Sequence, residues 1–246
     1  MPQELHDYDA VVFDPPRQGA QAQALVMAGV VLVDEKRVEK SSESFGHDAL
    51  IRLKGDSPAS RYVSRGGLKL EKALGEFAIE PDGFVCLDVG SSTGGFTDCL
   101  LKHGAARVTA VDAGTNQLVW GLRTDPRVDS REKTNARALI PADFPQLFDL
   151  IVVDVSFISV TKILPALRDL LVPSGRMIVL IKPQFEVGRS EVGKGGIVRD
   201  SVKHDRVVAE VNQAAVSCGL SVGGVIESPI FGAEGNKEFL ALYENT

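Results

Sequence analysis

Four apolar runs constrain the fold of this chain more than any other feature of its sequence. They lie at residues 84–90 (FVCLDVG), 107–114 (RVTAVDAG), 147–157 (LFDLIVVDVSF) and 175–186 (GRMIVLIKPQFE). The runs are rich in Val, Ile and Leu and do not alternate with polar residues, which is typical of strands buried on both faces of a parallel sheet.

Helical segments are expected between these strands, at 94–104, 159–171 and 201–220. Strands that alternate with helices predict a doubly wound, Rossmann-like α/β sheet. The last two apolar runs, 219–230 and 237–245, have no helix between them. They predict a final antiparallel pair of strands.

The first 60 residues follow a different pattern. Part of a helix is expected there, followed by short strands around a turn at residues 34–36, and the polar stretch 55–62 reads as a linker. This region predicts a small appendage to one larger domain.

Bulk composition excludes several classes of protein. No run of roughly 18 apolar residues could span a membrane, and the acidic, polar start MPQELHDYDA is not a signal peptide. The three cysteines are far apart and the four histidines show no ligand spacing, so we expect neither disulfides nor a metal site. A cytoplasmic protein is the expectation.

The net charge of −6 counts weakly against a nucleic-acid partner, because phosphate binding usually needs clustered Lys and Arg. Two segments, 61–72 and 188–206, are the best candidates for a local basic patch. Charge alone leaves a solvated surface equally open for both.

Residues 88–95 (DVGSSTGG) join an apolar run to a helical segment. Glycines there let the backbone approach a ligand closely, and the helix start offers free N–H groups. Asp112 ends the next run, where an acid suits the two ribose hydroxyls of a nucleoside cofactor; a helix cap is its structural alternative. The spacing is not that of a dinucleotide-binding loop, and no Walker-type motif is present.

Two charged residues stand at the expected carboxyl ends of the third and fourth strands, and ligands of such sheets bind at these ends. Asp154 follows the apolar residues of 147–157, and Lys182 follows those of 175–186. A lysine after five apolar residues is costly to bury unless it is used, although it can also reach water or pair with Asp154. Lys69, on an expected helix, and Glu238, at the start of the last strand, would each read as surface residues if taken alone.

Together Lys69, Asp154, Lys182 and Glu238 resemble the Lys–Asp–Lys–Glu tetrad of FtsJ-type ribose 2′-O-methyltransferases. The segments YVSRGGLKL, DVGSSTGGFTDCLL, NARAL, DVSFIS and KPQFEVG resemble the TlyA (hemolysin A) family of rRNA methyltransferases. The resemblance implies a class I fold dependent on S-adenosyl-L-methionine, and an acceptor that is a cytidine ribose in 16S rRNA, 23S rRNA or both.

The resemblance also implies the roles of individual residues. Lys182 is expected to be central, as a base or a directional hydrogen-bond partner of the 2′-hydroxyl, while Asp154 and Glu238 balance the positive charge. The residues expected to bind the cofactor are Asp88, Gly90, Ser91, Thr93, Gly94, Gly95, Phe96, Asp112, Asn135 and Asp154.

The N-terminus departs from the family pattern. Members carry a small S4-type RNA-binding domain that begins with a basic helix, whereas residues 1–20 here resemble the DPP motif of a base-modifying group. We therefore expect an atypical segment at 1–20, a partial S4-like domain at 21–56, a linker at 57–64 and an FtsJ-like methyltransferase domain at 65–246. A trimmed S4 domain predicts weaker rRNA binding.

Three other functions remain open from sequence. A methyltransferase for another acceptor is disfavoured by the tetrad, and a pore-forming hemolysin by the lack of a signal peptide or spanning helix. A catalytically weak RNA-binding or ribosome-assembly factor would leave the tetrad idle. The expected partner is ribosomal RNA or a ribosomal subunit, with no membrane, and the sequence does not indicate the oligomeric state.

Overall fold

A computed structural model describes residues 26, 27, 29, 31–33, 36–40, 42, 43, 45, 51–53, 61–232 and 234–245 of the 246-residue chain. The chain divides into two units, residues 1–61 and residues 62–246, and each has its own β-sheet. None of the helices in these described ranges is both long enough and apolar enough to cross a membrane.

The first unit contains a small antiparallel sheet in the order β2-β1-β3. Strand β1 (Val31–Val33) pairs with β2 (Lys36–Arg37) and with β3 (Ile51–Leu53). The short strands predicted on either side of the turn are therefore confirmed. The atypical segment 1–20 and most of the helix predicted after it lie outside the described residues, and the S4-like assignment stays a prediction.

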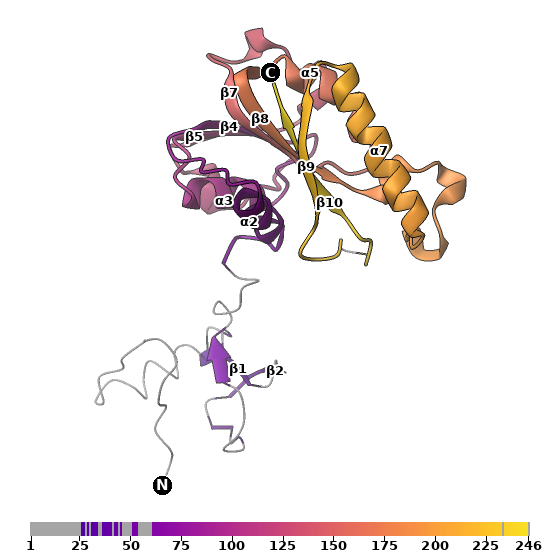
Figure 1. The fold of residues 1–246 in the computed structure, drawn as a ribbon. Helices are drawn as coiled ribbons and strands as arrows, with labels where there is room; N and C mark the ends of the chain where they lie inside the picture. Colours follow the sequence, from indigo (N-terminus) through magenta and orange to yellow (C-terminus); the bar gives the residue numbers. More distant parts are fainter. Residues whose placement is uncertain are drawn as a thin grey trace. The chain divides into compact units, whose positions relative to one another are not determined.

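The second unit is built on a seven-stranded sheet in the order β6-β5-β4-β7-β8-β10-β9 (Figure 1). Its strands are β4 (Val85–Val89), β5 (Arg107–Val111), β6 (Val128–Arg131), β7 (Phe148–Val153), β8 (Leu171–Ile181), β9 (Ser221–Glu227) and β10 (Phe239–Glu244). Strands β4, β5, β6, β7 and β8 run parallel to one another, whereas β10 is antiparallel to both β8 and β9. The doubly wound sheet and its antiparallel final pair are confirmed.

Helices cover both faces of this sheet (Figure 1). They are α2 (Gly66–Glu76), α3 (Gly95–Lys102), α4 (Trp120–Arg123), α5 (Leu164–Arg168), α6 (Pro183–Glu186) and α7 (Ser201–Ser217), with 3-10 turns at Ala136–Ala138, Pro141–Asp143, Val160–Lys162, Arg189–Glu191 and Lys194–Gly196. Buried side chains of α2 and α3 form one core with the sheet, and those of α5 and α7 form a second core. Strands buried between two helical layers explain why the apolar runs do not alternate.

Two predicted elements have different bounds in the structure. The single helix expected at 159–171 is a 3-10 turn followed by α5, because Pro165 has no N–H to continue a helix from the preceding turn. The strand expected at 175–186 begins earlier, at Leu171, and ends at Ile181. Residues Pro183–Glu186 form α6 instead, since proline suits the first turn of a helix.

Strand β6 was not predicted from the sequence. Its residues, VDSR, include a single apolar side chain, and all four are only partly buried at the edge of the sheet. An edge strand pairs with one neighbour only and is less buried than a central strand. It therefore does not need the apolar run that marks a strand buried on both faces.

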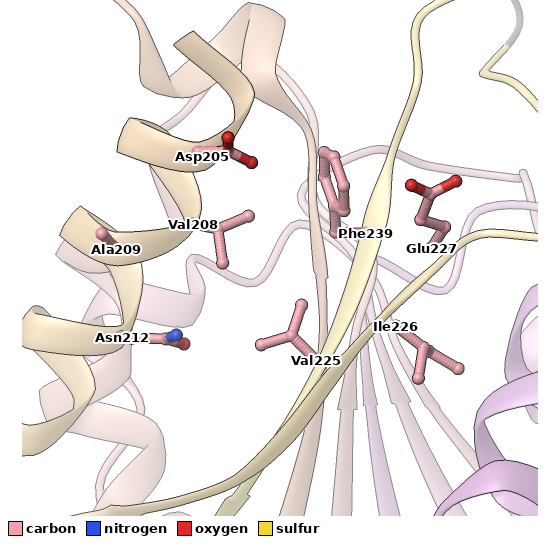
Figure 2. Close-up of a pocket in the computed structure, with 8 residues that line it drawn as sticks. All are labelled: Asp205, Val208, Ala209, Asn212, Val225, Ile226, Glu227 and Phe239. Atoms are coloured by element: carbon pink, nitrogen blue, oxygen red, sulfur yellow. The ribbon is translucent and has the colours of Figure 1, made fainter. Parts of the chain in front are cut away.

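The strand order reverses between β4 and β7, because β5 lies on the other side of β4. In sheets of this kind ligands bind beyond the carboxyl ends of the strands at that point. A shallow groove elsewhere, between α7 and strands β9 and β10, is lined by Asp205, Val208, Val225 and Phe239 (Figure 2). It lies on the α7 face of the sheet, over β9 and β10 rather than at the reversal between β4 and β7.

Candidate active site

Asp88 lies in β4, next to the loop that precedes α3, and is fully buried. Its Oδ2 accepts a hydrogen bond of 2.6 Å from Thr97 Oγ1, whereas Oδ1 has no hydrogen-bond partner among the residues that the structure describes. Burial raises the pKa of this carboxyl to about 7, and the Thr97 hydrogen bond opposes that rise. A buried carboxylate oxygen without a partner marks a point where a ligand donor can bind.

Two glycines let the loop between β4 and α3 pack closely against neighbouring segments. Gly90 has φ +85°, and a Cβ there would lie 2.3 Å from the carbonyl oxygen of Asp154. Gly94 has φ +100° at the N-cap of α3, where a Cβ would lie 2.3 Å from Leu122 Cδ1. Neither site accepts a side chain, so the backbone of the loop stays close to the end of β7 and to α4.

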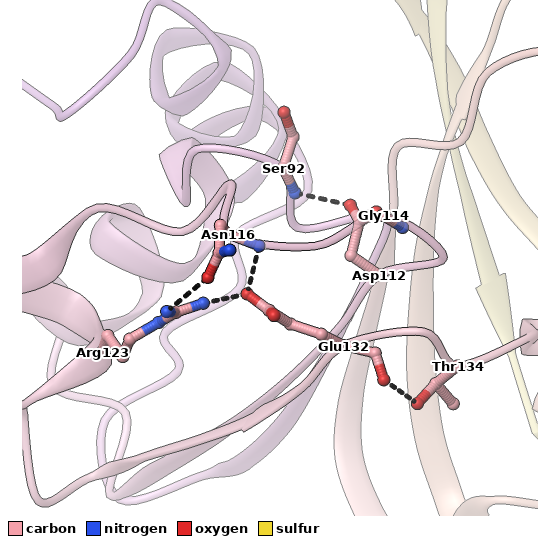
Figure 3. Close-up of polar contacts among 7 residues, drawn as sticks. All are labelled: Ser92, Asp112, Gly114, Asn116, Arg123, Glu132 and Thr134. Atoms are coloured by element: carbon pink, nitrogen blue, oxygen red, sulfur yellow. Dashed lines mark hydrogen bonds and ion pairs between the residues drawn. The ribbon is translucent and has the colours of Figure 1, made fainter.

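Asp112, directly after β5, accepts a hydrogen bond from the loop between β4 and α3 (Figure 3). Its Oδ2 accepts a hydrogen bond of 2.8 Å from Ser92 N, and its Oδ1 accepts one of 2.7 Å from Gly114 N. The carboxylate therefore joins the ends of two adjacent strands, and each oxygen keeps a second lone pair for a hydroxyl donor.

A second polar cluster supports the segment that follows Asp112 (Figure 3). Glu132, just after β6, accepts a hydrogen bond of 2.8 Å from Asn116 N and pairs with Arg123 of α4. Arg123 also donates to Asn116 Oδ1 at 3.1 Å. No sequence motif marks this cluster, because its members are common surface residue types without a characteristic spacing.

The other residues predicted to bind a cofactor lie around the same loop. The amide of Ser91 donates to Val111 O, the carbonyl of Thr93 accepts from Val119 N, and a Cβ at Gly95 would lie 2.3 Å from Ser64 Oγ. Phe96 is buried in the core shared by α2 and α3. Asn135 caps a 3-10 turn by accepting from Arg137 N. The roles of these residues toward a cofactor stay predictions.

Lys69 and Glu238 form a buried ion pair. Lys69 Nζ on α2 donates to Glu238 Oε2 at 2.5 Å, and the two side chains are only 8% and 3% exposed. Glu238 immediately precedes β10, and a Cβ at Gly232 would lie 2.5 Å from its other oxygen. This pair ties the first helix of the second unit to the last strand of the sheet.

Lys182 and Asp154 form a second ion pair at the ends of β8 and β7. Lys182 Nζ lies 2.5 Å from Asp154 Oδ1, and the two side chains are 11% and 22% exposed. The amine also donates to Ser156 Oγ at 2.9 Å. This pair is therefore more open than the first.

Strand register brings the two ion pairs to one edge of the sheet. Phe239 of β10 is paired with Ile181 of β8 in antiparallel register. The residue before Phe239 and the residue after Ile181 are therefore neighbours, and these are Glu238 and Lys182. All four residues of the predicted tetrad gather at the carboxyl ends of the parallel strands.

Two aromatic residues beside Lys182 were not predicted as site residues. Phe157 is 93% exposed and has φ +66°, a left-handed conformation that is strained for a bulky side chain. Its ring centre lies 5.2 Å from that of Phe185 on α6. The sequence signal was an aromatic residue three positions after Asp154, which a buried core position would explain equally well.

Within the described part of the chain, no group of three or more His, Cys, Asp or Glu residues could hold a metal ion.

Comparison with protein families gives one match over most of the chain. Residues 62–244 match the FtsJ-like methyltransferase family. The candidate rRNA methyltransferase YqxC of Bacillus subtilis is 48% identical over 221 residues, covering 89% of this chain and 78% of that protein. The 16S/23S rRNA (cytidine-2′-O)-methyltransferase TlyA of Mycobacterium tuberculosis is 44% identical over 223 residues, covering 91% of this chain and 83% of that protein.

Solved structures agree with the fold. A hemolysin-like protein from Streptococcus thermophilus superposes with a TM-score of 0.76 and 49% identity, covering 92% of this chain and 82% of that one. The N-methyltransferase NodS of Bradyrhizobium japonicum superposes with a TM-score of 0.51 at 17% identity, covering 72% of this chain and 96% of that one. The second likeness shows the fold alone, which is that of S-adenosylmethionine-dependent methyltransferases.

Proposed function

This chain belongs to the FtsJ-like methyltransferase family, and from that premise we propose that it methylates the 2′-hydroxyl of a cytidine ribose in 16S or 23S ribosomal RNA. The observation that carries the proposal is the meeting of two lysine–carboxylate pairs at the carboxyl ends of the parallel strands. The relative from Mycobacterium tuberculosis carries this activity in its name.

The residues around the glycine loop fit S-adenosylmethionine. Asp88 offers a buried carboxylate oxygen without a partner, which suits a cationic amino group. Gly90 and Gly94 hold the backbone of the loop against the end of β7 and against α4, and Asp112 has free lone pairs for ribose hydroxyls. When bound, this cofactor supplies an electrophilic methyl carbon on a sulfonium sulfur.

The protein's own groups act mainly by orienting the acceptor. A ribose hydroxyl is a weak nucleophile that must be held in line and relieved of its proton. Lys182 is the group proposed to orient the hydroxyl and receive its proton, with Asp154 balancing the charge of the amine. The buried Lys69–Glu238 pair holds α2 against the start of β10 and thereby shapes the wall beside Lys182.

The surroundings of Lys182 favour a nucleotide as acceptor. Phe157 presents its ring to solvent next to the ion pair, and exposed aromatic rings are the usual platforms on which unstacked RNA bases bind. Segment 21–56 is proposed as an S4-like RNA-binding part and residues 57–64 as its linker, on the strength of the sequence resemblance.

The test is methyl transfer from tritium-labelled S-adenosylmethionine to ribosomal subunits, and to naked rRNA, from a strain without an endogenous enzyme. The proposal expects label in RNA and 2′-O-methylcytidine in the nucleoside digest, identified by mass. Label in a methylated base, or cofactor binding by calorimetry without any transfer, would contradict it. Lysis of erythrocytes by cofactor-free protein would support a hemolysin instead.

A further inference from the structure

The amine of Lys182 forms its ion pair with one residue and its hydrogen bond with another. Asp154 Oδ1 lies 2.5 Å from Nζ but makes no aligned hydrogen bond. Within the described part of the chain, the one hydrogen bond of the amine goes to Ser156 Oγ, at 2.9 Å. Coulomb attraction depends mainly on distance, whereas a hydrogen bond weakens steeply when it is misaligned. Ser156 is therefore the residue that fixes where the amine points.

Ser156 stands on a loop that is tied to α6 along its length. Phe157 packs on Phe185 with ring centres 5.2 Å apart. Further along, Glu186 accepts hydrogen bonds from Ser159 Oγ at 2.6 Å and from Val160 N at 2.9 Å. The loop after β7 and the segment after β8 are thus held together on the C-terminal side of Ser156, so the backbone that carries Ser156 is supported by α6.

The loop beside the ion pair is open to solvent at Ser156 and Phe157. Ser156 and Phe157 are both exposed, whereas the side chain of Lys182 is only 11% exposed. An acceptor that reaches Nζ therefore approaches past Ser156. A serine there holds the amine without occupying the volume that the acceptor needs.

We infer that Ser156 is a positioning residue for the methyl transfer, which holds the amine of Lys182 so that its free position faces the acceptor hydroxyl. The inference rests on the proposed function, because it assigns Lys182 to that hydroxyl. No sequence motif pointed to Ser156 by itself; its role follows from the hydrogen bond to Lys182.

The geometry has a simple chemical consequence. Once the ammonium of Lys182 has released a proton to water, the amine carries two N–H groups and one lone pair. With one N–H on Ser156 and the other toward Asp154, the lone pair is left for the hydroxyl proton. As the acceptor oxygen bonds to the methyl carbon, the carbon–sulfur bond breaks with its electron pair on sulfur. The hydroxyl proton passes to Nζ, and the ammonium then releases a proton to water.

The first measurement compares Ser156→Ala and Ser156→Thr in full-length protein, with rRNA and S-adenosylmethionine as substrates. Ser156→Ala lowers kcat by about 10- to 100-fold, because a misaligned group loses much of its effect. The KM for rRNA stays within about twofold, since the substituted group does not bind the RNA. Ser156→Thr keeps the hydroxyl and retains most of the wild-type kcat.

A second measurement does not depend on activity. The ammonium signal of Lys182 is observed in ¹H–¹⁵N spectra of the cofactor-free protein and assigned by its absence in Lys182→Arg. The signal is present in wild type and in Ser156→Thr, and it shifts or broadens in Ser156→Ala. Ser217→Ala is the matched control, because that exposed hydroxyl makes its hydrogen bonds within α7, to the carbonyl of Gln213 and the side chain of that residue.

Three results overturn the inference: a wild-type kcat in Ser156→Ala, a loss that appears as a raised KM, or an unchanged Lys182 signal. A wild-type protein that methylates no RNA would refute the proposed function instead. The spectra would still decide whether Ser156 orients the amine.

Discussion

The two lysine–carboxylate pairs of the second unit have the same chemistry but different surroundings. The Lys69–Glu238 pair is 8% and 3% exposed and joins a helix to the last strand through a 2.5 Å hydrogen bond. The Lys182–Asp154 pair is 11% and 22% exposed, and its amine donates a hydrogen bond to an exposed serine. The first pair joins two buried elements, whereas the second is more accessible to the substrate proposed above.

The largest effect is expected at the open pair. Lys182→Ala lowers kcat by about 1000-fold or more, since it removes the group proposed to orient and deprotonate the acceptor. Cofactor affinity measured by calorimetry stays close to wild type, because the glycine loop and Asp88 are untouched. Substantial residual methylation would show that Lys182 is not the central residue.

Asp88 extends the comparison, because it is a buried carboxylate with no ion pair among the described residues. Its pKa is raised from 3.8 to about 7, so the native state keeps a proton that the unfolded state releases. The stability of the cofactor-free protein therefore falls as pH rises from about 4 to about 7, by about 4 kcal/mol from this group.

Asp88→Asn isolates that contribution, because the amide oxygen still accepts from Thr97 and carries no charge. Urea unfolding of both proteins across this pH range gives the difference directly. Parallel stability curves for wild type and Asp88→Asn would mean that Asp88 ionises normally in the folded protein.

Glu238→Ala tests the buried pair. It leaves the ammonium of Lys69 buried without its partner, which destabilises a fold by about 3 kcal/mol or more. Asp154→Ala, at the more exposed pair, costs less unfolding free energy, because Ser156 still accepts a hydrogen bond from the amine of Lys182. Equal losses in urea unfolding would remove the distinction between the pairs.

The double variant Lys69→Met with Glu238→Leu sharpens the same test. Apolar side chains of similar volume need no charge partner, so most of the lost stability returns. Methyl transfer remains impaired if the pair also shapes the active site. Full activity in this variant would make the pair purely structural.

The smallest effects are expected at the exposed aromatic residues. Phe157→Ala raises the KM for rRNA by about tenfold, from the loss of one stacked base. Phe231 is 64% exposed and lies next to Gly232, which approaches Glu238. Phe231→Ala has the smaller effect if the acceptor binds over the open pair, and an equal effect would extend the RNA site over both pairs.

The backbone of Phe157 provides an independent measurement. Its φ of +66° suits glycine, so Phe157→Gly raises the free energy of unfolding by about 1 kcal/mol while it weakens RNA binding. Phe157→Ala keeps most of the strain and leaves stability unchanged. A destabilised Phe157→Gly variant would show that the ring contributes more to packing on Phe185 than to substrate binding.

The central strands and their ends were predictable because burial on both faces leaves a long apolar run in the sequence. Strands β4, β5 and β7 appear where those runs lie, and Asp88, Asp112 and Asp154 stand at their carboxyl ends. Strand β6 and helix α6 escaped prediction, since an edge strand needs few apolar residues and a short helix after Pro183 has no periodicity.

The sequence by itself determined the sheet, the glycine loop and the four charged residue types that resemble a methyltransferase tetrad. Only the tertiary structure decided which lysine pairs with which acid, because Lys69 and Glu238 are 169 positions apart in the sequence and Glu238 also lies beside Lys182 through the antiparallel register of β10 on β8. It also showed the hydrogen bond from Lys182 to Ser156, on which the proposed positioning role of Ser156 rests. A serine carries no sequence signal of that role, since hydrogen-bond direction depends on where two strand ends lie in space.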